Sequence, residues 1–440
     1  MLILLVNMKI SYRTYKIKIG NILLLIALFF YLYGVGFSFL PLGTNKIIGM
    51  FLGLYILIFN LKSFIYFIKK NNALTYFFIM NIFLLIYTVN VTNYLVSNDY
   101  SLVYLFVIRV TVLFFPILFI AYLYNKKGID KFLFDLMIVI TIQSLLIYLS
   151  FFSLDFKLFV STILPQTGIM EGTRNFRVSG FTNTASASLS IVQGIGAYIA
   201  GYFLVKNKNT YISFVFFIII ILNIGATIFI GRTGLVLFGL TFFTYLLYQT
   251  FKGNSNIYYK LVIFISILIF VLTQLYLLIP IEQKELLETR IFPWALELFI
   301  NMLNSGEATT SSNETLWKML FLPQNIYTFV FGDGLYNVIN GNYMHTDSGY
   351  VRMIFAIGLV GTFLLYIPML YIWKKIIFKT ISKNIIIWFS ILIMFYFLIE
   401  IKEPFFIKPR TYTIIFLISA ILLTANRNIG INKTKDNSNE

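Results

Sequence analysis

The only histidine among the 440 residues is His345, and a carboxylate, Asp347, follows it by two positions. Imidazole has an ordinary pKa nearer to neutrality than any other side chain, so it can accept or donate a proton at working pH. Asp347 either orients the imidazole or caps the following helix, for which Ser348 is equally suitable. The pair is therefore a candidate acid–base site, with a solvated loop histidine as the alternative.

Arginines form a second set of candidates. Arg232 stands in IFIGRTGLVLF, between apolar residues, where its charge is costly unless it meets an anion or extends to the lipid headgroups. A role in ligand binding and snorkelling are thus the alternatives for Arg232. For Arg174 and Arg177, before a long apolar run, the alternatives are ligand binding and an ordinary basic loop residue beside an anionic bilayer. For Arg109, inside LFVIRVTVLF, an internal ion pair or a hydrogen-bonded strut is as good an explanation as a function.

Several arginines around one possible base suit a doubly charged anion. The guanidinium fork matches phosphate oxygens and keeps its proton. The diphosphate of a lipid-linked sugar is such an anion, with its head at the membrane interface and its isoprenoid tail in the bilayer. Sugar transfer from a diphosphate requires electrostatic neutralisation of the leaving group and deprotonation of an acceptor hydroxyl. The arginines suit the first requirement and His345 suits the second.

The elements that position these residues are expected to be membrane helices. The chain is 59% hydrophobic and only 12% charged, a composition typical of a polytopic membrane protein. The absence of cysteine excludes disulfides and cysteine-ligated metals, and a single histidine argues against a zinc site built on several imidazoles. We therefore expect no metal and no cofactor. The net charge of +17 does not indicate nucleic-acid binding, because the basic residues lie between apolar runs rather than in one stripe.

The sequence predicts an all-α fold with about twelve transmembrane helices, since each crossing needs about 20 apolar residues. The predicted spans are 20–41, 46–66, 73–96, 101–124, 132–153, 181–205, 211–230, 233–250, 261–280, 348–372, 385–400 and 411–425. Residues 1–19 form a cytoplasmic segment, residues 20–427 the membrane domain, and residues 428–440 a cytoplasmic tail.

The distribution of charge supports this topology. With the N-terminus inside, and with residues near the end of a span counted on the nearer side, 21 of the 34 basic residues fall on the cytoplasmic side, 12 fall outside and Arg109 lies deep within a span. Only four of the 17 acidic residues are inside. Both termini are therefore expected to be cytoplasmic.

Two outer segments are longer than a turn, at about 154–180 and 281–347. The second is the only sizeable polar region and precedes span ten. Its first part, EQKELLETRIFPWALELFINML, mixes carboxylates with apolar residues and predicts a helix near the membrane surface, with Pro293 at its start or at a kink. Residues 304–313 are expected to form a loop, and a second short helix is expected at about 314–322.

Three segments of this chain are similar to those of the O-antigen polymerase and O-antigen ligase superfamily of bacterial membrane glycosyltransferases. They are RVSGFTNTASAS (177–188), IFIGRTGLVLF (228–238), and FGDGLYN followed by HTDSGYVRMIFAIGLVG (331–361). The resemblance covers about 174–370 and includes the large outer loop before span ten. It departs where the family often has a serine before the second-motif arginine, since Gly231 stands there, which puts in question a hydroxyl role at that position.

The resemblance implies polymerisation of oligosaccharide repeat units, for an O-antigen of lipopolysaccharide or a capsule, from an undecaprenyl diphosphate carrier. It also implies that this occurs at the outer face of a bacterial cytoplasmic (inner) membrane. It implies that Arg177 and Arg232 hold the diphosphate, that His345 assists the acceptor hydroxyl, and that Arg290 replaces or supplements an arginine. Arg174 is a further candidate for the diphosphate, and Asp347 for the catalytic pair. The expected partners are the lipid-linked oligosaccharide and the bilayer, together with a flippase and a chain-length regulator of the same pathway.

Three other functions are compatible with the same sequence features. A ligase shares the architecture, and a cell-wall glycosyltransferase of another lineage would use similar groups. A flippase for lipid-linked oligosaccharides also has about twelve spans, but it would place its charges near the midplane and often shows two related halves. The candidate charges here gather at the outer face, and the chain has no visible repeat, which disfavours a flippase. A polymerase is favoured over a ligase because HTDSGYVR (345–352) is more similar to the segment found in polymerases.

Overall fold

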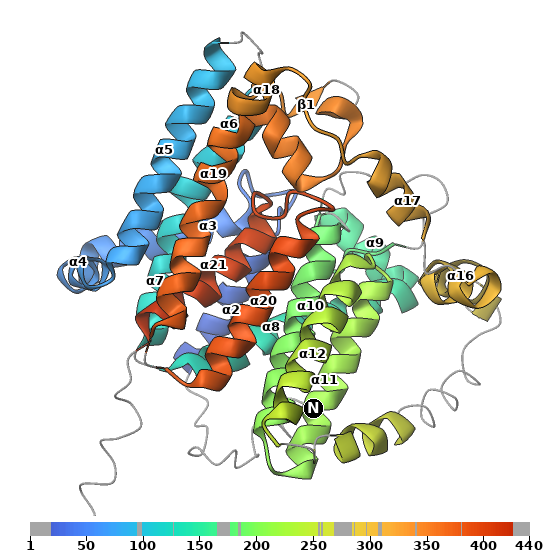
Figure 1. Ribbon diagram of the computed structural model, residues 1–440. Coiled ribbons are helices and arrows are strands. Elements are labelled where there is room, and N and C mark those ends of the chain that lie inside the picture. The colour runs from blue at the N-terminus through green and yellow to red at the C-terminus, as the bar shows by residue number, and fades with distance from the viewer. Residues whose placement is uncertain are drawn as a thin grey trace, which may run out of the picture. The chain divides into compact units, whose positions relative to one another are not determined.

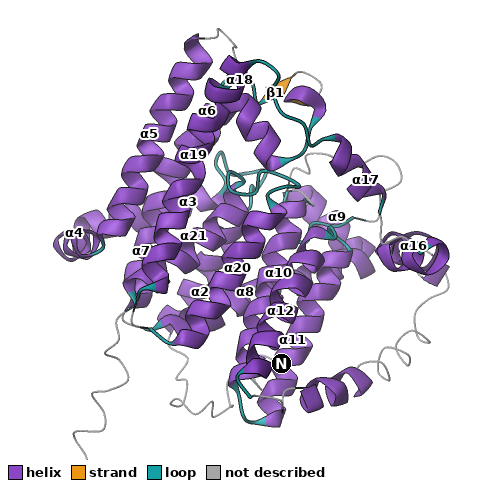
Figure 2. Cartoon of the chain, in the orientation of Figure 1, coloured by secondary structure: helices purple, strands orange, loops and turns teal. Residues whose placement is uncertain are grey.

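Apolar helices form nearly all of the part of the chain that the structure describes (Figure 2). This is the expected solution for a chain in lipid, because a helix satisfies its own backbone hydrogen bonds. The computed structural model describes residues 19–94, 99–125, 127–164, 177–183, 186–253, 256, 258–267, 284–285, 287–295, 297–306, 310–338, 341–379 and 381–425.

Eight helices within these ranges are long and apolar enough to cross a membrane. They are Thr44–Lys70, Asn72–Tyr94, Ser101–Asn125, Ile129–Phe152, Ala187–Lys206, Thr210–Ile228, Thr233–Phe251 and Gly349–Ile377. Four shorter apolar helices are Gly20–Tyr33, Tyr258–Ile267, Lys383–Ile399 and Pro409–Thr424. The chain is thus an all-α polytopic membrane protein.

The contacts divide the chain into two compact units. Unit 1 consists of Met1–Phe30, Val35–Pro41 and Phe134–Ser311, and unit 2 consists of Tyr31–Gly34, Leu42–Leu133 and Ser312–Glu440. Helix α2 (Ile19–Tyr33) and helix α8 (Ile129–Phe152) each contribute residues to both units.

Unit 1 is organised around helix α10, which packs against α11 and α12. The elements of unit 1 that follow α8 are α9 (Leu154–Ile163), α10 (Ala187–Lys206), α11 (Thr210–Ile228), α12 (Thr233–Phe251), the π-helical turn η3 (Leu287–Ile291), α15 (Phe292–Ala295) and α16 (Glu297–Ser305). Helices α10 and α12 approach closely because glycines meet there: a Cβ added at Gly194 would lie 2.3 Å from the carbonyl oxygen of Gly234. Small residues at a crossing are a general means of packing membrane helices.

A buried polar network also joins the helices of unit 1. The hydroxyl of Ser144 on α8 lies 2.8 Å from Oε1 of Gln193 on α10 and 2.7 Å from Oδ1 of Asn223 on α11. The Asn223 amide donates to the hydroxyl of Thr141 at 3.2 Å. Such interhelical bonds contribute about 1 kcal/mol each, and they fix the rotation of the three helices relative to one another.

Unit 2 contains the remaining elements (Figure 1). They are α3 (Thr44–Tyr55), the π-turn η1 (Ile56–Asn60), α4 (Leu61–Lys70), α5 (Asn72–Tyr94), α6 (Ser101–Ile108), the π-turn η2 (Arg109–Leu113), α7 (Phe114–Asn125), α17 (Ser311–Lys318), α18 (Ile326–Phe331), β1 (Asn337–Val338), β2 (Gly341–Asn342), the 3-10 turn η4 (Tyr343–His345), α19 (Gly349–Ile377), α20 (Lys383–Ile399) and α21 (Pro409–Thr424). The first residue of α17, Ser311, is assigned to unit 1. Helix α19 packs against α5, and α7 packs against α21. The two strands form an antiparallel hairpin in which Asn337 pairs with Asn342.

The short helix α18 lies directly on α19. Gly358 interrupts α19 with a φ of 63°, and a Cβ there would lie 2.3 Å from the carbonyl oxygen of Val330. The amide N–H groups of Asp333 and Gly334 then donate to the carbonyls of Phe355 and Ala356, at 2.7 and 3.0 Å. The start of the polar loop after α18 is therefore attached to the membrane helix that follows it.

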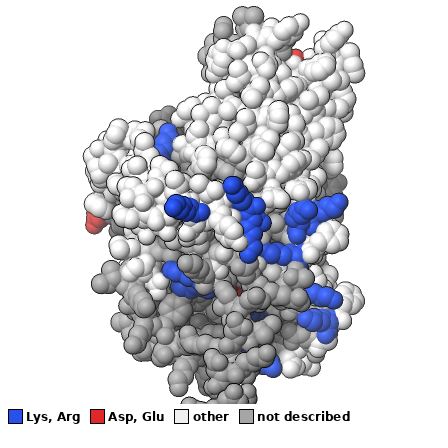
Figure 3. Space-filling view, turned by 90° about the vertical axis from the view of Figure 1, so that its left-hand side faces the viewer, with Lys and Arg blue, Asp and Glu red and all other residues white. Residues whose placement is uncertain are grey.

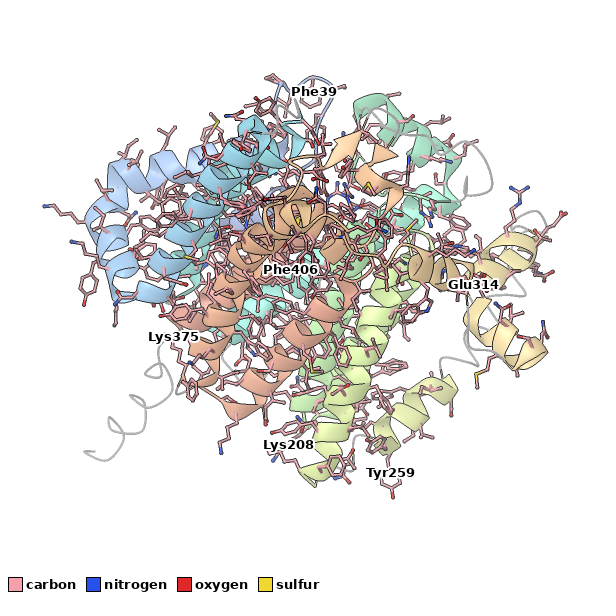
Figure 4. All side chains as sticks on the ribbon, turned by 45° about the horizontal axis from the view of Figure 1, so that its top comes forward. Phe39, Lys208, Tyr259, Glu314, Lys375 and Phe406 are labelled. Atoms are coloured by element: carbon pink, nitrogen blue, oxygen red, sulfur yellow. The ribbon has the colours of Figure 1, made fainter. Side chains whose placement is uncertain are left out.

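Arg109 is a structural strut inside unit 2. Its guanidinium lies 4.2 Å from the ring centre of Tyr412 and 5.8 Å from that of Phe77, and Nη1 donates to the carbonyl of Phe406 at 3.3 Å. Phe406, labelled in Figure 4, lies with its ring centre 4.7 Å from that of Tyr396. Cation–π contacts of a desolvated arginine are worth about 2 kcal/mol. Among the alternatives for Arg109, these contacts favour the hydrogen-bonded strut.

Most predicted spans agree with the helices to within a few residues, and the predicted break at Gly231–Arg232 is confirmed, since α11 ends at Ile228 and α12 begins at Thr233. The helix predicted at 181–205 begins later in the structure, at Ala187, the first residue of α10. The predicted surface helix is divided into η3, α15 and α16, with Pro293 inside α15. The second half of the predicted span 261–280 lies outside the described residues.

Candidate functional site

The turn that carries Arg232 is fixed by α10. The Ser190 hydroxyl donates to the carbonyl oxygen of Gly231 and accepts a hydrogen bond from the amide of Gly234 at 3.0 Å. The amide of Gly231 donates to the carbonyl of Thr227 at 2.7 Å. A side chain on α10 thus satisfies backbone groups on both sides of Arg232, so the arginine leaves the helix break from a rigid base.

Arg232 contacts the polar segment of unit 1 that contains α15 and α16. Its Nη1 donates to the carbonyl oxygen of Trp294 at 2.9 Å and to the carboxylate of Glu297. The guanidinium carbon lies 4.9 Å from the centre of the Trp294 ring. The side chains of Arg232 and Glu297 are only 16% and 22% exposed. Arg232 therefore pairs with a carboxylate of its own chain, through a half-buried contact, instead of extending to headgroups.

Arg177 approaches the same indole ring. Its guanidinium carbon lies 5.2 Å from the ring centre of Trp294. The neighbouring amide of Val178 donates to the carbonyl of Phe229 at 3.1 Å, which attaches this segment to the end of α11. The two guanidinium carbons consequently lie no more than about 10 Å apart. The structure thus brings together two of the predicted arginines, around one tryptophan.

This arginine pair can bind a doubly charged anion. Two guanidinium groups offer planar forks of N–H donors, which form paired bonds with phosphate oxygens. One carboxylate, from Glu297, partly neutralises them. A diphosphate that displaces the Glu297 carboxylate would accept hydrogen bonds from both arginines. The indole ring would keep the two guanidinium groups in place through cation–π contacts.

His345 lies in unit 2, at the end of the turn η4, and it is exposed. Its φ is 51° and that of Met344 is 57°, a left-handed conformation that costs non-glycine residues about 1–2 kcal/mol each. Hydrogen bonds on both sides hold this turn: the Tyr343 hydroxyl donates to Asp333 at 2.9 Å, and the Thr346 hydroxyl donates to the Met319 carbonyl at 3.0 Å. Strain of this kind is concentrated at functional positions.

Asp347 does not have the position predicted for a helix cap. Its carboxylate accepts a hydrogen bond from the side-chain amide of Asn342 at 2.5 Å. The N-cap residue of α19 is Ser348, whose side chain forms no capping bond. Ser348 thus takes the N-cap position expected for it or for Asp347, but neither side chain supplies a capping bond among the described contacts: the hairpin binds Asp347, and the Thr346 hydroxyl accepts from the Ser348 amide at 3.2 Å. Among the described contacts, none joins Asp347 to His345.

Two charged residues that the sequence did not single out hold this loop in unit 2. The carboxylate of Asp99 accepts from the amides of Tyr336 and Asn337, both at 2.7 Å. From α19, Arg352 donates to the carbonyl of Tyr336 at 3.3 Å and to Oδ1 of Asn337 at 3.1 Å. Although partial burial opposes ionisation, the hydrogen bonds from Asn337, Ser101 and Tyr336 hold the pKa of Asp99 below its usual value. Asp99 and Arg352 thus both bind the dipeptide Tyr336–Asn337, which ends eight residues before His345.

The other candidates are less central. Arg290 is exposed on η3, and among the described contacts no hydrogen bond or ion pair joins it to the arginine pair. Arg174 lies outside the described residues.

Trp294 and Glu297 were missed as site residues, although a signal was present. They are three positions apart, so a helical segment would place both on one face, beside the break that Pro293 indicates. We interpreted that stretch only as a helix on the membrane surface. No family model, curated protein or solved structure matches this chain, so the geometry of its own residues carries the functional argument.

Proposed function

We propose that this protein is a membrane glycosyltransferase that polymerises lipid-linked oligosaccharide repeat units, for an O-antigen or a capsule. The donor is an undecaprenyl diphosphate-linked oligosaccharide at the outer face of a bacterial cytoplasmic membrane. The observation that supports this proposal is the convergence of Arg177 and Arg232 on Trp294. A pair of fixed arginines beside apolar helices suits an anion attached to a hydrophobic chain.

In the proposed reaction, an acceptor hydroxyl attacks the anomeric carbon of the donor sugar. The bond between that carbon and the diphosphate oxygen breaks as the new glycosidic bond forms. Arg177 and Arg232 neutralise the charge that develops on the departing diphosphate, and the hydroxyl proton passes to His345. The exposure of His345 makes it accessible to an acceptor. We assign twelve spans to the membrane domain, with both termini cytoplasmic.

The first test is deletion of the gene in its own host, followed by complementation with variants. Deletion should leave acceptors that carry one repeat unit, and Arg177→Ala or Arg232→Ala should fail to restore polymer although the protein is inserted at normal levels. Lys157→Ala, which removes an exposed cation of unit 1 on α9, is the matched control and should restore it. Unattached carrier-bound polymer after deletion would instead indicate a ligase, and donor retained on the cytoplasmic side would indicate a flippase.

His345 needs a substitution that keeps the backbone conformation. Asparagine tolerates a positive φ better than most residues, so His345→Asn removes the titrating ring without adding strain. We expect His345→Asn to abolish polymer, whereas Met344→Asn in the same turn should retain it. Normal polysaccharide from the Arg177, Arg232 and His345 variants alike would refute the assigned site.

Binding can be tested without knowing the sugar. Undecaprenyl diphosphate is the probe and undecaprenyl monophosphate the control, with complexes of the purified protein detected by native mass spectrometry. We expect Arg232→Lys to bind the diphosphate at least about tenfold more weakly, because lysine lacks the planar fork. Equal affinity of the native protein for both lipids would contradict the assignment of the arginine pair to the diphosphate.

A further inference from the structure

A second basic site lies in unit 2, next to the C-terminal end of α19, which is the end opposite to His345. A cavity of ≈ 750 Å³ opens there between the ends of α4, α7 and α21. Its lining includes Lys62 and Lys70 from α4, Lys379 from the segment after α19, and the side-chain amides of Asn71 and Asn125. None of the described lining residues is acidic, so three lysines line one cavity without a carboxylate among them.

Lys379 is the most constrained of the three cations. Its Nζ donates to the carbonyl of Leu422 at 3.2 Å and to that of Leu423 at the end of α21. Burial, and then the charge of Lys70, lower the pKa of Lys379 to about 8. Lysines that only mark the cytoplasmic side of a membrane protein extend into water, whereas Lys379 is held inside the rim of the cavity. A bound anion would offset the repulsion between these two ammonium groups.

The lining also contains an unused acceptor. Oδ1 of Asn125 is buried and has no hydrogen-bond partner among the residues that the structure describes, a state that costs about 1–3 kcal/mol. The hydroxyl groups of Ser63, Tyr66 and Tyr122 line the same cavity. A ligand that carries a hydroxyl donor next to a phosphate would satisfy Asn125 and the lysines together.

The surface that leads into this cavity is apolar. The helical segment Thr44–Lys70 has only 11% of its apolar window buried inside the protein. Ile58, Phe59 and Tyr66 on this segment are 68%, 69% and 69% exposed. The face of the molecule on which α4 lies shows many Lys and Arg side chains and very few Asp and Glu side chains (Figure 3). An apolar helix face that ends in a basic cavity matches the two parts of a phospholipid.

We propose that this cavity binds the phosphate headgroup of an anionic glycerophospholipid, whose acyl chains lie along α3 and α4. Basic pockets between membrane helices bind such headgroups in general. This site is independent of the proposed glycosyl transfer, because it uses none of the residues assigned to that reaction.

The test measures lipid retained by the full-length protein in detergent, by native mass spectrometry. The probes are phosphatidylglycerol and phosphatidylcholine with identical acyl chains. Lys62→Gln/Lys70→Gln removes two lining cations, and Lys69→Gln/Lys375→Gln is the matched control, since both of its lysines are exposed and neither lines the cavity. We expect the first pair to weaken phosphatidylglycerol binding at least about tenfold and the control pair to leave it nearly unchanged.

Three outcomes would overturn the proposal. Equal losses in both double variants would show a general surface charge effect. Equal retention of the two lipids by the native protein would show that no headgroup is recognised. Displacement of phosphatidylglycerol by inorganic phosphate or glycerol phosphate at equal concentration would identify a soluble phosphate as the occupant. Thermal unfolding of each variant, together with Lys62→Gln alone, separates loss of the site from loss of the fold.

Discussion

At the residue scale, the ion pair between Arg232 and Glu297 determines how readily the arginine pair accepts an anion. The carboxylate already supplies the charge and oxygen geometry that a phosphate would offer. A ligand must displace it, and breaking an ion pair whose side chains are only 16% and 22% exposed costs on the order of 1 kcal/mol or more. Glu297 is thus an internal competitor for the proposed substrate.

We predict that Glu297→Gln strengthens the binding of undecaprenyl diphosphate by about threefold to fivefold, because the competing charge is removed. Native mass spectrometry with the purified protein measures this change. Glu285→Gln is the control, since Glu285 is an exposed glutamate of the same outer segment. Weaker binding in Glu297→Gln would show that this carboxylate organises the arginines and does not compete with the ligand.

Asp99 gives a prediction about pH. Its pKa is lowered in the folded protein, so its stabilising effect is complete above the ordinary value of about 4 and is lost as the pH falls through the lowered value. At neutral pH, Asp99→Asn should destabilise the loop after α18 by about 1–3 kcal/mol, because the amides of Tyr336 and Asn337 lose a charged acceptor. The rate of proteolytic cleavage within residues 333–345 reports this effect.

The difference in cleavage rate between Asp99→Asn and the native protein should begin to shrink as the pH falls below about 4 and should vanish below the lowered pKa of Asp99, where the native carboxyl is also neutral. Asp155→Asn on α9 changes an exposed carboxylate elsewhere and should leave the loop unaffected. A difference that persists unchanged at low pH would mean that the carboxylate charge does not hold the loop.

The sequence identified the charged candidates better than their partners. Arg177 and Arg232 attract notice because a cation beside apolar residues is costly, and that cost can be read from local sequence. Trp294 and Asp99 act through contacts 62 or more positions away in the chain. Local sequence contains no record of such pairings, so only the fold reveals them.

At the scale of elements, the position of Arg232 depends on the close contact between α10 and α12. A Cβ at Gly234 would lie 1.9 Å from the carbonyl oxygen of Ser190, a backbone atom that cannot rotate away. We predict that Gly234→Ala forces the helices apart, lowers the thermal stability by about 1–3 kcal/mol and abolishes polymer formation.

Gly239, on the same helix, provides the matched control. A Cβ there would have no neighbour within 4 Å, and alanine favours a helix over glycine by about 1 kcal/mol. Gly239→Ala should therefore unfold at the same temperature as the native protein or slightly higher. Normal stability and activity of Gly234→Ala would show that the crossing tolerates the extra methyl group.

Spans were more predictable than the outer loop. A run of about 20 apolar residues is a strong signal because lipid admits few other structures. The loop elements α18, β1 and β2 have two to six residues, and their stability comes from contacts with α19 and Asp99. Elements this short have too little periodicity to predict.

At the scale of the whole molecule, the number of membrane crossings decides on which side of the membrane each loop lies. Three of the eight long apolar helices lie between positions 208 and 375: α11, α12 and α19. If only these three cross the membrane, Lys208 and Lys375 lie on opposite sides. The twelve-span prediction adds a crossing at 261–280, which places both lysines in the cytoplasm.

We predict that both lysines are cytoplasmic and that Glu314 is outside. Because the chain has no cysteine, Lys208→Cys, Lys375→Cys and Glu314→Cys each introduce a unique label site at exposed positions, labelled in Figure 4. A membrane-impermeant maleimide should modify the Glu314→Cys protein in intact cells and the other two only after permeabilisation. Labelling of Lys375→Cys but not Lys208→Cys in intact cells would remove the ninth crossing, and labelling of both would invert the protein. Either result would require a different face for the arginine pair or for His345, because Arg232 is one crossing from Lys208 and His345 is one crossing from Lys375.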